Sequence, residues 1–151
     1  MLEKAKREAV NLQKAINTQQ SDQITDAIFN FAVTAHHIKD WAKKYFGLNK
    51  GWEKDFINQH LELCLCADIC NNAKHQELDD PDREKNDPLV SINPSMLTAD
   101  MTTFTFDQTI PLNANTVRIH LQSGKKLEIM DFTNRVIALW EKFLSEKEMK
   151  K

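Results

Sequence analysis

Residues 61–75 read LELCLCADICNNAKH, and this stretch decides how the rest of the chain is organised. Its first ten residues carry two charged side chains, Glu62 and Asp68, so a helix here would be apolar over most of its circumference. Its last five residues are polar or small. The stretch therefore predicts a central helix that is buried at its start and reaches solvent at its end, near His75.

The polar end of this helix is the candidate functional site. At about 3.6 residues per turn, Asp68, Asn71, Lys74 and His75 fall on or beside one face. His75 is the candidate acid–base or phosphate-contacting group, because histidine titrates near neutral pH without perturbation, and Asn71 is its candidate catalytic partner. Asp68, Lys74 and, from a facing helix, Asn30 are candidate ligand-binding residues. Alternatively, these side chains satisfy one another and the helix C-terminus.

The composition favours a single domain with no membrane-spanning segment. The chain has 151 residues and a net charge of −2, which excludes a global basic field for nucleic acid, so any such contact would be local. No apolar run approaches the roughly 20 residues that span a bilayer. Cys64, Cys66 and Cys70 lie two and four residues apart on one predicted helix, where their side chains are badly placed for disulfides. We expect a cytoplasmic protein with reduced thiols.

Hydrophobic periodicity predicts two further helices in the first half of the chain and extends the central helix back to residue 52. A spacing of three to four residues between apolar side chains indicates helices over residues 2–17, about 22–46 and 52–75. Because the 47–51 connection is short, the last two should form an antiparallel hairpin. This hairpin would place Asn30 level with Asp68, and His37 level with His60.

The pattern changes in the second half, where apolar and polar residues alternate with a period of two. We expect Leu121 to pair with Leu127 and His120 to oppose Glu128. The predicted fold is one α+β domain, mainly α: an antiparallel bundle of about four helices with a three-stranded antiparallel β-meander before the last. Its parts are a helical region 1–80, an acidic loop 77–95, the meander 101–130 and a C-terminal helix 132–148.

A second cluster of residues offers a metal site as an alternative. His60 and Cys64 are four residues apart, and the hairpin would bring His37 level with them from the facing helix. Imidazole and thiolate are ligands that zinc prefers, so these three side chains form a candidate zinc site. Since neither CxxC nor HExxH occurs, we predict no metal and no cofactor, and keep the trio as an alternative.

Two segments resemble motifs of known families. TAHHIKDW (34–41) and ADICNNAKH (67–75) are similar to paired motifs of small bacterial and mobile-element proteins, which combine a polar helix hairpin, a short sheet and a terminal helix and have no assigned reaction. More distantly, Asn71-x-x-x-His75 resembles the Arg-Asn-x-x-x-His signature of HEPN domains, over about residues 1–80. Cys70 stands where that signature has its arginine.

The HEPN resemblance implies a function. HEPN domains are helical bundles of toxin–antitoxin and phage-defence systems, and many are metal-independent ribonucleases whose signature Arg and His act at a dimer cleft. By this resemblance, the chain is a homodimeric module that binds RNA or a nucleotide at Asp68, Asn71, Lys74 and His75, and catalysis is left open. The alternative is a non-catalytic interaction module, which dimerises through its helix hairpin and binds a basic protein partner through acidic residues 77–87.

Overall fold

Helices make up most of the chain in a computed structural model, which describes residues 1–75, 117–121 and 126–149. The elements are α1 (Leu2–Thr18), α2 (Ser21–His36), α3 (Ile38–Phe46), α4 (Trp52–Ile57), α5 (Leu61–His75), β1 (Arg118–His120), β2 (Lys126–Glu128) and α8 (Ile129–Glu148). The structure thus confirms a mainly helical fold with a small antiparallel sheet. The first predicted strand of the meander and the acidic loop 77–95 lie outside the described residues.

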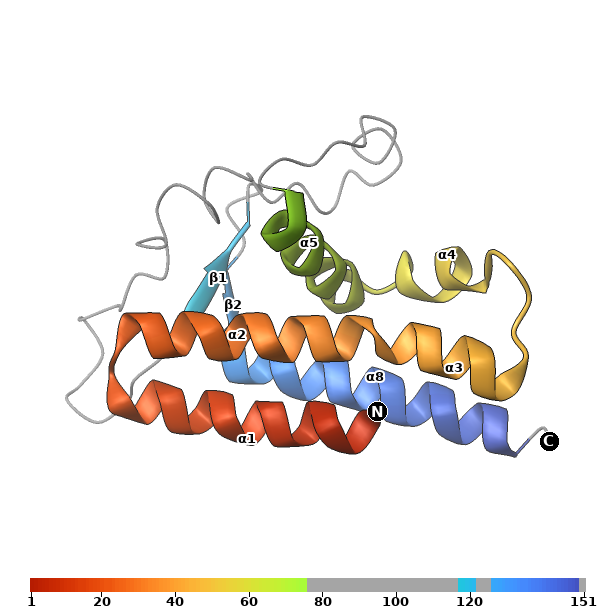
Figure 1. Cartoon of the computed structure of the whole chain (residues 1–151), viewed down its shortest axis with the longest axis horizontal. Coiled ribbons are helices and arrows are strands. Elements are labelled where there is room, and N and C mark those ends of the chain that lie inside the picture. The colour runs from red at the N-terminus through yellow and green to blue at the C-terminus, as the bar shows by residue number, and fades with distance from the viewer. Residues whose placement is uncertain (76–116, 122–125, 150–151) are drawn as a thin grey trace.

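The long helices lie side by side (Figure 1). α1 packs against α2 and α8 and runs opposite to both, while α3 continues the line of α2 beyond His37. Each helix turns an apolar stripe inward, as its periodicity predicts, and the largest fully buried side chains include Trp140, Phe31, Phe132 and Leu12. In this described part of the chain, no helix combines the length and the apolar character needed to cross a membrane.

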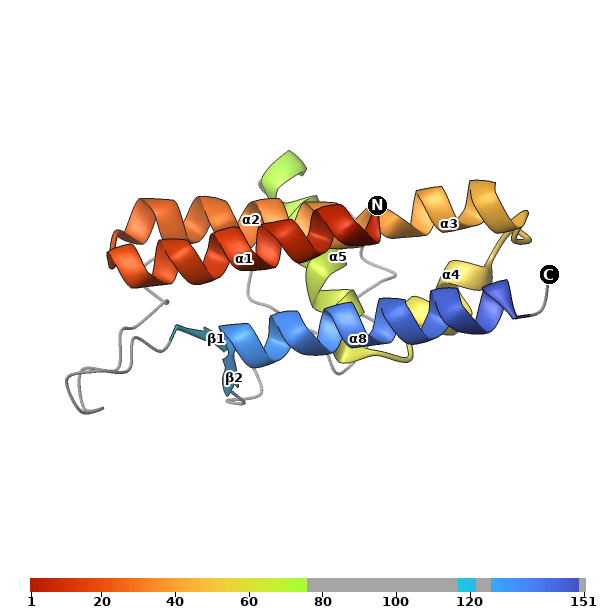
Figure 2. The ribbon, with the colours of Figure 1, turned by 90° about the horizontal axis from the view of Figure 1, so that it is seen from below.

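α5 crosses the long helices instead of lying antiparallel to one of them. Figure 2 shows it passing from the level of α8 to that of α2, and it packs on both. The predicted antiparallel hairpin is therefore wrong, and the level pairing of Asn30 with Asp68 loses its basis. Asn30 is exposed on α2, whereas Asp68 is buried. The change of direction occurs at residues 58–60, between α4 and α5.

Side chains near this break donate hydrogen bonds to carbonyl groups that lack a partner within the helix. The last carbonyls of a helix lack intrahelical partners, so a helix that ends inside a fold needs other donors. His60 Nδ1 lies 2.7 Å from the carbonyl oxygen of Phe56 and must donate to it, since a carbonyl oxygen can only accept. The thiol of Cys64 donates to the carbonyl of Ile57 at 3.3 Å. These local bonds allow α4 to end and α5 to start in a new direction.

The β-hairpin has the predicted buried face but not the predicted register. The partners are Arg118 with Glu128, Ile119 with Leu127, and His120 with Lys126. Every pairing is thus two residues away from the expected one, a shift that keeps Ile119, Leu121 and Leu127 buried because side chains alternate with a period of two.

The early start of α8 accounts for this shift. The carboxylate of Glu128 accepts a hydrogen bond from the Asp131 backbone N–H at 2.6 Å. Glu128 is thus the N-cap of α8, whose first residue is Ile129. The expected register would pair Ile129 with Ile119, but Ile129 is the first residue of the helix. Its N–H instead donates to the Val117 carbonyl at 2.9 Å. α8 thus begins at Ile129, three residues before the predicted start at residue 132.

Candidate functional site

The predicted polar residues lie towards the C-terminal end of α5, after a run of buried residues. Every residue from Leu63 to Cys70 is buried, and Asn71 is the first that is half-buried. The prediction of a central helix that emerges towards its C-terminal end is correct over these residues. A helix held on both sides by α2 and α8 is a rigid support for the groups at its end.

The structure keeps part of the predicted site together. Asp68 is 4% exposed and lies one turn before half-buried Asn71, so both share one side of α5. Lys74 and His75 belong to the last turn of the same helix, but their side chains lie outside the described part. Asn30 lies on the exposed surface of α2, and the hairpin that was expected to bring it level with Asp68 does not form.

The three cysteines of α5 are buried and form no disulfide. Burial raises the pKa of the Cys66 thiol, and the charges of the neighbouring thiols, Glu62 and Asp68 act in the same direction. The thiol therefore stays protonated at neutral pH. Because the thiolate is the nucleophile and the metal ligand, Cys66 is not an activated group.

The alternative zinc trio does not form a site. His37 Nδ1 lies 2.9 Å from an Asp40 carboxylate oxygen in the first turn of α3, while His60 and Cys64 bond to the carbonyls at the end of α4. Across residues 1–75, 117–121 and 126–149, no three His, Cys, Asp or Glu side chains are grouped so that they could hold a metal ion. The metal alternative therefore has no support in this part of the chain.

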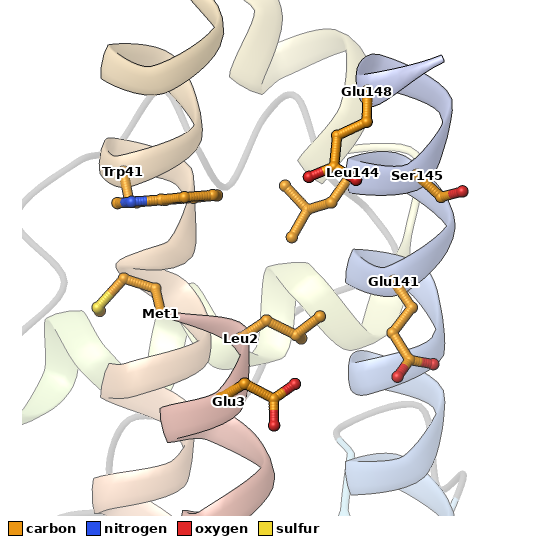
Figure 3. A pocket seen from close by; sticks show the side chains of 8 residues that line it. All are labelled: Met1, Leu2, Glu3, Trp41, Glu141, Leu144, Ser145 and Glu148. Atoms are coloured by element: carbon orange, nitrogen blue, oxygen red, sulfur yellow. The ribbon is translucent and has the colours of Figure 1, made fainter.

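A pocket of about 340 Å³, which the sequence did not reveal, lies where the start of α1 meets α3 and the end of α8 (Figure 3). Its lining combines apolar and acidic side chains: Met1, Leu2, Glu3, Trp41, Glu141, Leu144, Ser145 and Glu148. These residues come from three distant segments, so no spacing in the sequence connects them. Trp41 is the one aromatic residue among them, and a single tryptophan on a helix is equally typical of ordinary packing.

Three comparisons, with protein-family models, with curated proteins and with solved structures, found no match for this chain. The function proposed below therefore comes from the residues of α5 and their resemblance to the HEPN signature.

Proposed function

We propose that the chain is a HEPN-like module of a bacterial defence or toxin–antitoxin system that binds RNA or a nucleotide at the end of α5. The observation that carries the proposal is the change along α5 from the buried residues Leu63–Cys70 to half-buried Asn71. A helix whose body is fixed in a core holds the polar groups of its last turns in a defined geometry, which a binding site requires.

Each residue of the last turns has a role that its chemistry suits. The Asn71 carboxamide both donates and accepts hydrogen bonds, so it suits a base edge or a ribose hydroxyl. Lys74 offers a compact positive charge to a phosphate. His75 donates to a phosphate or moves a proton near neutral pH. Since the C-terminal end of a helix carries partial negative charge, attraction for phosphate has to come from Lys74 and protonated His75.

In a stronger form of the proposal, the chain also hydrolyses the RNA that it binds. Cys70 stands at the arginine position of the HEPN signature and is 1% exposed, so it supplies no cation to a phosphate. Lys74, about one turn further along α5, is the nearest replacement. A ribonuclease of this kind would shorten RNA in the presence of a chelator, because its chemistry would use side chains alone.

Binding to RNA tests the proposal directly. We would titrate the full chain into a short fluorescein-labelled single-stranded RNA of mixed sequence at low salt and follow the anisotropy. Asn71→Ala and Lys74→Ala should each weaken binding about tenfold, the factor that about 1.4 kcal/mol carries. Lys14→Ala, which removes an exposed lysine from α1, is the control of equal charge and should bind like the unaltered chain. Absence of binding, or equal weakening by all three substitutions, would contradict the proposal.

A further inference from the structure

We propose that the pocket between α1, α3 and α8 binds an arginine side chain presented by a basic segment of a partner protein. The pocket shares no residue with the site at the end of α5, so this inference is independent of the proposed function. Its volume of about 340 Å³ is at the small end of the range of roughly 300–1,000 Å³ that ligand sites occupy. A pocket of this volume suits a single long side chain of a partner better than a broad contact with a folded surface.

The apolar part of the pocket fits the aliphatic stem of an arginine. Leu144 on α8 is buried, and Leu2 at the start of α1 is half-buried. Figure 3 shows both leucines facing the space between the helices, with the Trp41 ring extending from α3 toward Leu144. Arginine and lysine lay their methylene groups along such surfaces while the charged end stays in water.

Trp41 offers an aromatic face to the charged end. One side of its ring stacks on Tyr45, with the ring centroids 4.9 Å apart and the planes 11° from parallel. In Figure 3 the ring is seen edge-on, with Met1 and Leu2 to one side of its plane. Tyr45 therefore fixes the ring, and the side turned to Met1 faces the pocket. A planar guanidinium stacks on a tryptophan face, and this contact favours arginine over lysine.

The rim of the pocket is acidic. Lys6 lies 3.0 Å from a Glu3 oxygen and 2.9 Å from a Glu141 oxygen, so these two carboxylates share one cation. Glu148, on the last turn of α8, makes no ion pair with any residue that the structure describes. Three carboxylates, the Lys6 ammonium and the α-ammonium of Met1 leave a net charge of −1 at the rim. Glu148 is thus placed to form the two parallel hydrogen bonds that guanidinium and carboxylate make together.

Peptide binding to the full, ¹⁵N-labelled chain tests this inference. The probe is the acetylated and amidated peptide Ala-Leu-Arg-Leu-Ala, compared with versions that carry lysine or citrulline in place of arginine. The readout is the indole N–H signal of Trp41, assigned with Trp41→Phe. Saturable movement of this signal with the arginine peptide, a weaker response to lysine and none to uncharged citrulline are expected. A citrulline peptide that binds as well as the arginine peptide would overturn the inference.

Two glutamates of α8 provide a matched pair of variants. Glu148→Gln removes the rim carboxylate and should weaken the arginine peptide about fivefold, in line with an exposed ion pair. Glu146→Gln makes the same change at an exposed position of the same helix that does not line the pocket, and should leave binding unchanged. Both side chains are exposed, so neither change should disturb folding. Equal affinity of the two variants would also overturn the inference.

Discussion

Cys66 keeps its proton because of where it lies in α5. Its side chain is 1% exposed, and burial raises its pKa. A thiol that stays neutral packs as a small apolar group and reacts slowly with alkylating reagents. Since Cys64 and Cys70 are also buried thiols outside any disulfide, a thiol reagent should reach all three cysteines only when the chain is unfolded.

The same thiol should make the protein less stable at alkaline pH. In the unfolded chain a thiol ionises above about pH 8.5, whereas folded Cys66 holds its proton. The unfolded state then binds fewer protons, so the free energy of unfolding falls as the pH rises, by at most about 1.4 kcal/mol per pH unit for this group. Below about pH 8.5 both states are protonated and the effect vanishes.

Urea titrations from neutral to alkaline pH measure this effect. Cys66→Ala is the control, because it removes the thiol while the other ionisable groups remain. The free energy of unfolding of the variant should fall less steeply with pH than that of the unaltered chain. Parallel pH profiles would show that Cys66 ionises alike in both states.

His37, His60 and Cys64 show why residue type alone did not identify a site. Imidazole and thiol groups bind metals, but they also form hydrogen bonds, and an uncompensated helix end needs such bonds. His60 and Cys64 meet the carbonyls of Phe56 and Ile57, and His37 meets Asp40. The spacing of four residues between His60 and Cys64 is the same in either role, so only the path of the chain separates them.

At the scale of elements, periodicity predicted where helices exist better than where they break. The helix expected over 2–17 is α1, and the stop near Phe46 is correct because Gly47 adopts the left-handed conformation, with φ 62°, that ends α3. The breaks at His37 and at residues 58–60 were not predicted. An apolar stripe continues across a break, and the new direction depends on packing between distant segments.

Glu128 links the short sheet to α8. Its carboxylate accepts the Asp131 N–H at 2.6 Å and so satisfies one of the free donors at the start of α8. We expect Glu128→Ala to lower the free energy of unfolding by roughly 1 kcal/mol, and Glu128→Gln by less, because glutamine retains an acceptor oxygen.

Denaturant unfolding of these variants tests the role of this cap. Glu146→Ala, an exposed change near the other end of α8, is the control and should have a negligible effect. If Glu128→Ala is no less stable than Glu146→Ala, the cap does not contribute to stability.

At the scale of the whole molecule, the HEPN-like proposal implies two copies. In that family the site lies at a dimer cleft, so we expect light scattering to give twice the 17.5 kDa of one chain at micromolar concentration. A mass of 17.5 kDa at every concentration tested would remove the dimer from the proposal. RNA binding by a single copy would still be tested by the anisotropy titration.

The two sites differ in how far the sequence could predict them. Asp68 and Asn71 lie on one helix, so helical spacing alone placed them together. The acidic pocket joins Glu3, Trp41 and Glu148, which are separated by most of the chain. Their meeting depends on how α1, α3 and α8 pack, and a single sequence contains no local signal of that packing.

The proposed RNA site is tested most sharply by measuring both stability and RNA binding of His75→Ala. If His75 belongs to a site, its loss should change the free energy of unfolding by less than about 0.5 kcal/mol and weaken RNA binding about tenfold or more. His120→Ala, which removes a histidine from β1, should change neither quantity. A His75→Ala protein that is destabilised by roughly 1 kcal/mol or more, yet binds RNA as tightly as the unaltered chain, would show that His75 is not part of an RNA-binding site.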